Sequence, residues 1–182
     1  MLDEKQLIAG CIKNNLASQK ALYERYAGKM LVVCMRYTKD RPEAEDILQE
    51  AFFKVFANLS KFRAEGSFEG WIRRIMVNTA LKHHRKIKMY AITSLEEARL
   101  HNEDASALSD IGYEELLDMI QKLPDRYRVV FNLYIMDGYT HEQIAKLCNI
   151  ATGTSKSTLS RARVMLQQQL LKREQADEQY YK

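Results

Sequence analysis

The sequence has few of the residues that interrupt helices or cross-link small secreted domains. Its 182 residues include two prolines, seven glycines and three cysteines. The cysteines, Cys11, Cys34 and Cys148, are far apart and match no metal-ligand spacing. Each lies at or near an apolar helical position, so we expect buried, reduced thiols of the kind found in cytosolic proteins. The composition therefore argues against a disulfide scaffold and against a cysteine-based metal site.

Long apolar runs are also lacking. No segment of about 18 consecutive apolar residues occurs, so we expect no membrane insertion. The start, MLDEKQLIAG, has neither a basic region nor a long apolar core, and it predicts no signal peptide. Alternation of the strand type is absent over any useful length, whereas apolar residues recur at the helical spacing of three and four. We therefore expect an all-α protein located in the cytoplasm.

Enzyme signatures are missing as well. The sequence contains no glycine loop that would hold a nucleotide, no HExxH pair and no nucleophile motif. Asp46 and Glu50 are one helical turn apart, but no matching ligands elsewhere complete a metal site. His83 and His84 have neither ligand spacing nor a nearby acid, and we interpret them as solvated flanks of a helix. We predict no catalytic residue, no metal and no cofactor.

The charges are arranged in blocks that the net charge of +4 conceals. Residues 71–88 contain six Lys or Arg and no acid, and residues 143–173 again contain six and no acid. Between them, residues 95–118 contain eight acids and one Arg. Ordinary surface charge is one interpretation of this pattern. The other, which we favour, is two polyanion-binding surfaces joined by a solvated connector.

Helical periodicity predicts two small helical domains. Residues 1–89 form the first and residues 113–182 the second, and periodicity fades over an acidic linker at 90–112. The C-terminal tail, EQADEQYYK, is polar and is expected to fray. Helices are expected over about 4–13, 18–38, 42–59 and 68–88 in the first domain, and on both sides of Pro124 in the second.

Residues 139–163, YTHEQIAKLCNIATGTSKSTLSRAR, predict a helix-turn-helix. Thr140 and Gln143 have the spacing of a capping box at the first helix, and Asn149 marks its end. The second helix begins near Thr152 and carries an apolar side made of Leu159, Ala162, Leu166 and Leu170. A basic and hydroxylic side suits the acceptor-rich major groove of DNA. That side presents Lys156, Ser157, Ser160 and Arg161.

The helix predicted over 42–59 has an aromatic residue on its polar side. Phe53 lies almost opposite the apolar stripe, and Asp46, Gln49 and Glu50 share its side at helical spacing. An aromatic residue within an acidic patch is a reasonable docking surface for a basic protein partner. A singly exposed Phe is equally common, and spacing alone does not decide between the two interpretations.

The helix predicted over 68–88 carries a polar ridge made of Arg74, Asn78, Lys82 and Arg85. Asn can read base edges, and the cations can bind phosphates. The preceding segment, KFRAEGSFEGW, combines cations such as Arg63 with aromatics such as Phe62 that can stack on unpaired bases. Core packing is the competing interpretation, and we favour it for Phe68 and Trp71.

Together these motifs resemble bacterial RNA polymerase sigma factors of the extracytoplasmic-function (ECF) group in the sigma-70 family. The stretch EAEDILQEAFFKVFANLSKF, followed by SFEGWIRRIMVNTALKHHRK, resembles region 2 of that family. LPDRYRVVFNLYIMDGYTHEQIAKLCNIATGTSKSTLSRARVMLQQQL resembles region 4. The resemblance covers most of residues 17–172, with both regions in the family's order and spacing.

The resemblance implies a function and partners. The chain would bind core RNA polymerase and promoter DNA, direct initiation at specific promoters and help to melt them, without being an enzyme. An anti-sigma factor is a further expected partner. The clamp helices of the largest polymerase subunit would contact Asp46, Gln49, Glu50 and Phe53. The minus-ten element would contact Phe62, Arg63, Arg74, Asn78, Lys82 and Arg85, and the minus-thirty-five element Lys156, Ser157, Ser160, Arg161 and Arg163.

The chain departs from the family pattern at Ala151, Ser155 and Thr158. At these three positions the family usually has a serine-like cap, a branched apolar residue and an Arg, respectively. The resemblance therefore does not determine which minus-thirty-five sequence the chain prefers. A stand-alone helix-turn-helix regulator is the main alternative, but it would need a dimer interface or an effector domain, and neither is visible. A small nuclease is a second alternative, and it would need a cluster of carboxylates or histidines.

Overall fold

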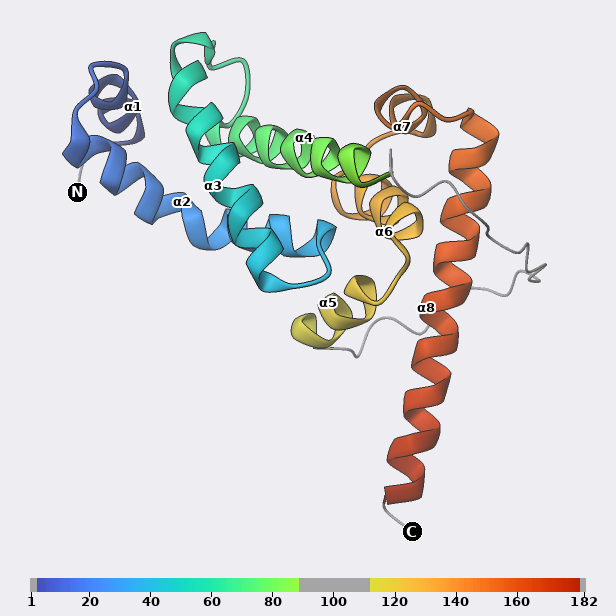
Figure 1. Ribbon diagram of the computed structural model, residues 1–182. Helices are drawn as coiled ribbons and strands as arrows, with labels where there is room; N and C mark the ends of the chain where they lie inside the picture. Colours follow the sequence, from blue (N-terminus) through green and yellow to red (C-terminus); the bar gives the residue numbers. More distant parts are fainter. Residues whose placement is uncertain (1–2, 89–111, 181–182) are drawn as a thin grey trace. The chain divides into compact units, whose positions relative to one another are not determined.

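The computed structural model describes residues 3–88 and 112–180, except for the side chains of 85–88, 174 and 176–180. Within those residues the chain forms eight α-helices and no β-strand, which confirms the all-α prediction. The chain divides into two compact units, Met1–Tyr90 and Ala91–Lys182, and each is described by itself (Figure 1). The predicted linker at 90–112 lies outside the described residues, apart from Gly112.

Three long helices build the first unit. They are α2 (Leu16–Tyr37), α3 (Arg41–Asn58) and α4 (Phe68–Lys88), and each packs against the other two, while α1 (Glu4–Ile12) packs on α2. A 3₁₀ turn, η1 (Leu59–Lys61), follows α3. Each fully buried Leu, Ile, Met or Phe contributes roughly 1.5–3 kcal/mol. Such residues at the centre of this unit are Leu22, Met30, Ile47, Leu59, Phe68, Ile72 and Met76.

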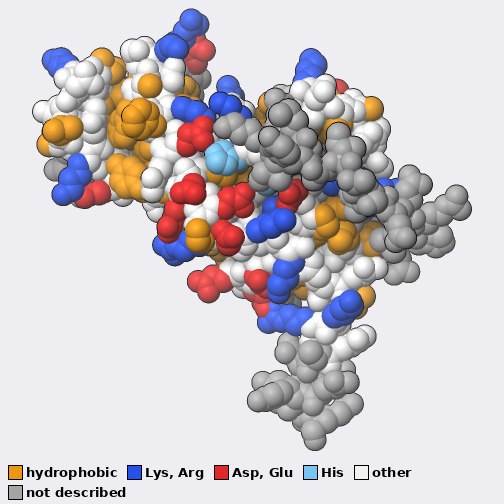
Figure 2. Space-filling view, in the orientation of Figure 1, with side chains coloured by type: hydrophobic (Ala, Val, Ile, Leu, Met, Phe, Trp, Pro, Cys, Tyr) orange, Lys and Arg blue, Asp and Glu red, His pale blue; other side chains and the backbone are white. Residues whose placement is uncertain are grey.

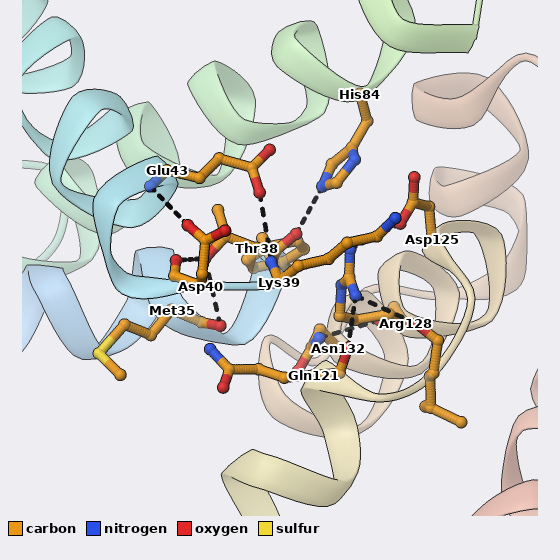
Figure 3. Close-up of polar contacts among 12 residues, drawn as sticks. Met35, Thr38, Lys39, Asp40, Glu43, His84, Gln121, Asp125, Arg128 and Asn132 are labelled. Atoms are coloured by element: carbon orange, nitrogen blue, oxygen red, sulfur yellow. Dashed lines mark hydrogen bonds and ion pairs between the residues drawn. The ribbon is translucent and has the colours of Figure 1, made fainter. Parts of the chain in front are cut away.

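Side-chain hydrogen bonds define the turn between α2 and α3 (Figure 3). Oδ1 of Asp40 accepts a hydrogen bond from the backbone N–H of Glu43 at 2.9 Å and caps α3. Pro42 lies in the first turn, where a helix needs no backbone N–H donor. The buried hydroxyl of Thr38 donates to the backbone oxygen of Asp40 at 3.1 Å. These local signals explain why α3 begins close to its predicted start.

The two histidines of α4 make contacts within the unit. The prediction that both are solvated is therefore wrong for His84 and only partly right for His83, whose side chain is 29% exposed. His84 is 6% exposed, and its Nε2 lies 2.5 Å from the backbone oxygen of Tyr37 at the end of α2 (Figure 3). The last carbonyls of a helix lack an intrahelical donor, so a buried ring can satisfy one of them. His83 is half-buried, with Nε2 2.8 Å from Oε2 of Glu50 on α3. The acid that the prediction lacked comes from another helix.

The described part of the second unit contains four helices and a turn of π-helix. Pro124 separates the first two helices as predicted, and the π-helical turn extends the second. The last helix packs against the other three, and its predicted apolar side is buried throughout. The elements are α5 (Tyr113–Gln121), α6 (Asp125–Phe131), η2 (Asn132–Met136), α7 (His141–Cys148) and α8 (Thr152–Tyr180).

The α8 helix continues to Tyr180 and so includes residues 174–180 of the tail that we predict to fray. Leu170 is buried, and Arg173 forms an ion pair with Glu115 of α5. These contacts hold the second half of α8 on the domain. Extending an existing helix by one residue is far easier than starting one, so the polar residues continue it.

Arg128 on α6 is fully buried and closes the end of α5 (Figure 3). Its Nη1 donates to the backbone oxygens of Gln121 at 2.8 Å and Leu123 at 3.1 Å. Its Nη2 donates to Oδ1 of Asp125 at 2.7 Å. Carbonyls at a helix end need a donor from elsewhere, and Arg128 supplies two. The buried charge is tolerated because it is both paired and hydrogen-bonded.

Candidate nucleic-acid and protein-binding surfaces

The α7 helix, the turn after it and the start of α8 form the predicted helix-turn-helix. The hydroxyl of Thr140 accepts from the backbone N–H of Gln143 at 3.3 Å, and Oε1 of Gln143 accepts from the N–H of Thr140 at 2.8 Å. These two bonds confirm the capping box. Asn149 ends α7 with a left-handed φ of 54°, which Asn adopts more readily than most residues. The residues at its two ends therefore determine where α7 begins and where it ends.

The first turns of α8 present the residues that we predict to enter the major groove. Lys156, Ser157 and Arg163 are exposed, whereas Ser160 and Arg161 are half-buried. Lys156 also lines a hollow of about 520 Å³ together with the first residues of α7. The start of α8 is thus accessible to DNA, beside the N-terminal end of α7.

Two of the departures from the family pattern lie on the buried side of α8. Ser155 is fully buried, and Thr158 is 6% exposed. A buried hydroxyl needs a hydrogen-bonding partner. Oγ of Ser155 lies 2.9 Å from Nδ1 of His141, whose ring stacks on Tyr134 with centroids 4.5 Å apart. The substitution at position 155 therefore changes the packing between α7 and α8.

The polar ridge of α4 faces solvent. Arg74, Asn78 and Lys82 are exposed and lie at helical spacing along one side. Neither Arg74 nor Lys82 is paired with a carboxylate in the parts of the chain that the structure describes. The side chain of Arg85, the fourth residue of the predicted ridge, lies outside those parts. The ridge offers positive charge that no acidic side chain of the described chain offsets.

A hollow of about 430 Å³ adjoins this ridge, within the loop between η1 and α4. Phe62, Phe68 and Trp71 form one cluster, with ring centroids 5.0–5.7 Å apart. Phe68 is buried, as predicted, whereas Phe62 and Trp71 are half-buried and line the hollow. A hollow of this size falls in the range of small-molecule sites. Its cationic residues are Lys61, Arg63 and Arg74.

The predicted docking face of α3 is exposed around its aromatic residue. Phe53 is 82% exposed, and Asp46 and Gln49 are also exposed. Figure 2 shows acidic side chains gathered over α3. A large apolar side chain this exposed gains nothing from the core of its own unit, and it is accessible to a partner.

Glu50 differs from the rest of this face because both of its carboxylate oxygens are engaged within the unit. Oε1 lies 2.7 Å from Nζ of Lys54, and Oε2 lies 2.8 Å from Nε2 of His83. The hydrogen bonds from Lys54 and His83 lower the pKa of Glu50 to about 2. Lys54 also donates to the hydroxyl of Thr79 at 3.0 Å. Glu50 therefore braces α3 against α4.

Sequence reasoning missed Lys54 and His83 as partners of Glu50. The spacing of Glu50 and Lys54 by four residues is a usable signal for their ion pair. Nothing in the local sequence indicates His83, which is on α4. Among the described residues, no group of three or more His, Cys, Asp or Glu is placed to hold a metal ion. No helix in the described parts has the length and apolar character needed to cross a bilayer.

Comparison with known proteins assigns both units. The Sigma-70 region 2 family matches residues 22–89, and the Sigma-70 region 4 family matches residues 113–166. The chain is 30% identical over 175 residues to the RNA polymerase sigma-H factor of Pseudomonas aeruginosa, over 88% of this chain and 90% of that protein. It is 31% identical over 159 residues to the ECF RNA polymerase sigma factor SigW of Bacillus subtilis, and the match covers 80% of this chain and 84% of that protein.

A solved structure shows the same fold. It is the co-crystal structure of the sigma factor RpoE with the anti-sigma factor NepR from Bartonella quintana. The match has a TM-score of 0.50 and 22% identity, and it covers 83% of this chain and 95% of that chain.

Two helical units, one with a helix-turn-helix and one with a cationic ridge beside an aromatic hollow, define a DNA-binding transcription protein. The chain belongs to the extracytoplasmic-function group of the sigma-70 family of RNA polymerase sigma factors. It therefore directs RNA polymerase to promoters, which confirms the function that the resemblance implied. Sigma factors are transcription initiation factors by family, and the family assignment sets aside the stand-alone regulator and the nuclease.

Proposed function

We propose that the two units divide promoter recognition between them. Residues 1–89 would bind core polymerase and the minus-ten element, residues 113–182 would bind the minus-thirty-five element, and residues 90–112 would connect the two. The observation that carries this proposal is the exposed ridge of Arg74, Asn78 and Lys82 beside a hollow of about 430 Å³. Accessible cations next to an aromatic-lined cavity are what a surface for unpaired bases requires.

The upstream contact is made to paired DNA. The start of α8 enters the major groove, where Lys156, Ser157 and Ser160 meet base edges and Arg161 and Arg163 meet bases or flanking phosphates. Each well-formed bidentate contact to a base contributes about 1–3 kcal/mol of discrimination. The exposure of Lys156, Ser157 and Arg163 supports this assignment.

The downstream contact is made to parted strands. The loop hollow takes a base that has left the stack, with Phe62 and Trp71 as its apolar wall and Arg63 at its rim. Unstacking a base costs a few kcal/mol, and the open strand recovers that energy by binding groups that the duplex does not reach. Asn78 reads a base edge, while Arg74, Lys82 and Arg85 bind phosphates.

The docking face of α3 binds the clamp helices of the largest polymerase subunit. Phe53 is the apolar anchor, and Asp46 and Gln49 surround it with polar groups that suit a basic partner. Glu50, which the sequence groups with this face, contributes chiefly by bracing α3 against α4 through Lys54 and His83. The anchor therefore stands on a fixed helix, which reduces the entropy lost on binding.

Core polymerase makes the two weak DNA contacts cooperative. Free in solution, each unit binds DNA only weakly, because each makes few contacts. Once polymerase fixes their separation, the second contact becomes intramolecular, at a high effective concentration. The chain itself catalyses no covalent chemistry, which core polymerase supplies. It acts in the cytoplasm, where core polymerase and promoter DNA are found. The solved RpoE–NepR complex supports an anti-sigma factor as a further partner.

In-vitro transcription with core polymerase on a pooled promoter library tests the proposal. We expect specific initiation only when chain and core are both present, and tight operator binding by the chain alone would contradict it. Asn78→Ala should alter base preference at the minus-ten element, and Lys156→Ala should weaken binding at the upstream element and reduce its salt dependence. Equal loss on all minus-ten sequences with Asn78→Ala would mean that Asn78 only positions the DNA.

A further inference from the structure

The first helix of the chain, α1, lies next to the segment that leads into the loop hollow. It precedes the residues that match the Sigma-70 region 2 family, which begin at 22. Leu7 and Cys11 form its buried apolar side. The helix packs on α2 and also on η1, whose last residue, Lys61, lines the hollow. A helix outside the matched region therefore supports the entrance to this loop.

One hydrogen bond joins α1 to the centre of the unit. The hydroxyl of Tyr26 on α2 donates to Oε2 of Glu4 on α1. Tyr26 is 4% exposed, so its hydroxyl needs a partner inside the protein, and Glu4 supplies a charged one. Burial and this hydrogen bond raise the pKa of Tyr26 to about 12, so the hydroxyl stays a donor near neutral pH. Glu4 therefore holds the Tyr26 ring in place.

The Tyr26 ring extends this contact to the aromatic wall of the hollow. It packs edge-to-face on Phe68, with ring centroids 5.6 Å apart and planes 75° apart. Phe68 stacks on Trp71 at 5.7 Å and meets Phe62 edge-on at 5.0 Å. Phe62 and Trp71 line the hollow, and the buried Phe68 contacts both. Because a closely packed interior transmits small displacements, a shift of Tyr26 moves Phe68 and with it both lining rings.

We propose that Tyr26 and Glu4 are positioning residues for the unpaired base that enters the loop hollow, and that α1 acts in promoter melting through them. The proposal rests on the proposed function of the hollow. Neither residue lines it, so both act through Phe62 and Trp71. A binding site is precise only when the packing and hydrogen bonds around it hold its contact residues in place. The bond between Tyr26 and Glu4 supplies this support for stacking on a base.

A structural role alone is the competing explanation for this hydrogen bond. In that case, removing the bond lowers the melting temperature of the first unit and leaves the binding of unpaired bases unchanged. A positioning role predicts weaker capture of one unpaired base, while binding of the paired upstream DNA stays constant. The two explanations therefore differ in a quantity that can be measured.

The test uses the full-length chain assembled with core polymerase and bound to promoter DNA whose minus-ten region is unpaired. Each unpaired position carries in turn its normal base or an abasic site, and the ratio of the two binding constants measures capture of that base. Wild-type holoenzyme should favour the normal base about tenfold at one position, which identifies the base in the hollow. Tyr26→Phe keeps the ring and removes the hydroxyl, and it should reduce this ratio about threefold.

Variants of Glu4 separate the hydrogen bond from the other contacts of α1. Glu4→Ala should reduce the ratio as much as Tyr26→Phe does, and the double variant should reduce it no further, because both changes remove the same bond. Glu4→Gln keeps an acceptor and should retain most of the ratio. Two matched controls on α2 should leave the ratio unchanged: Tyr23→Phe, and Glu24→Ala, which removes an exposed carboxylate.

The fluorescence of Trp71, the only Trp in the sequence, gives a second readout that needs no DNA. Glu4→Ala and Tyr26→Phe should increase its quenching by acrylamide, since a displaced Phe68 no longer covers the indole ring. If both variants keep the wild-type ratio, this inference is overturned, even if their melting temperatures fall. If the wild type itself binds the normal and abasic DNAs equally at every position, the proposed role of the hollow is refuted, and this inference with it.

Discussion

Replacing Arg128 with alanine should destabilise the second unit and leave the first unchanged. The substitution removes the hydrogen bonds that Arg128 donates to the backbone oxygens of Gln121 and Leu123, and it removes the ion pair between Arg128 and Asp125. An unsatisfied buried group costs about 1–3 kcal/mol, and breaking a buried ion pair costs about 3–5 kcal/mol. The side chain of Asp125 is 25% exposed and can recover some hydration. We therefore expect a loss of about 3–4 kcal/mol.

That loss is large for a unit of this size. Whole domains are stable by about 5–15 kcal/mol, and small ones lie at the lower end. With a urea dependence of about 1 kcal/mol per molar, the midpoint of the unit should fall by about 3 M. The Arg128→Ala unit would then keep only about 1–2 kcal/mol of stability and begin to unfold at low urea.

The single tryptophan allows the two units to be followed separately. Trp71 is the only Trp in the sequence and lies in the first unit, so its fluorescence reports that unit, whereas helical circular dichroism reports both. In urea titrations of the full chain, Arg128→Ala should shift the unfolding transition of the second unit, which is seen by circular dichroism. The transition of the first unit, which is seen by Trp71 fluorescence, should not move. Arg163→Ala, at an exposed position, should shift neither. An unchanged second-unit midpoint, or an equal shift in fluorescence, would refute the role assigned to Arg128.

Three further outcomes are expected. Phe53→Ala should reduce co-purification with core polymerase by tenfold or more with an unchanged melting temperature, because Phe53 is 82% exposed; equal co-purification would rule it out as the anchor. Glu50, with a pKa of about 2 against an ordinary 4.5, stabilises the first unit above pH 4.5 and loses this effect as pH falls towards 2. Glu50→Gln should therefore lower the melting temperature near neutral pH but not near pH 2, and a pH-independent difference would contradict this. A thiol reagent should modify half-buried Cys148 in the native protein faster than buried Cys11 and Cys34, since burial raises the pKa of Cys34 to about 12; three equal rates would argue against the described burial.

Features that depend on neighbouring residues in the chain could be predicted. The caps at Asp40 and Thr140, the left-handed end at Asn149 and the break at Pro124 each depend on one residue and its immediate surroundings. The apolar sides of the helices were predictable for a similar reason, because helical geometry alone places residues three and four apart on one face.

Contacts between helices could not be predicted in this way. His83 meets Glu50 and His84 meets the carbonyl of Tyr37 only after α2, α3 and α4 have packed, and nothing near the histidines in the sequence indicates either partner. Departures from a family pattern were equally hard to judge, because only the structure shows that position 155 is buried.

The uninterrupted α8 helix joins the two ends of the second unit. At 1.5 Å per residue its 29 residues span about 43 Å, and its first turns carry the side chains that we propose to read the groove. Further along the helix, Arg173 pairs with Glu115 of α5, close to where α5 begins. Because α8 also packs on α6 and α7, all four helices of the described part form one packed body. The proposed reading side chains would therefore meet DNA with the whole unit behind them.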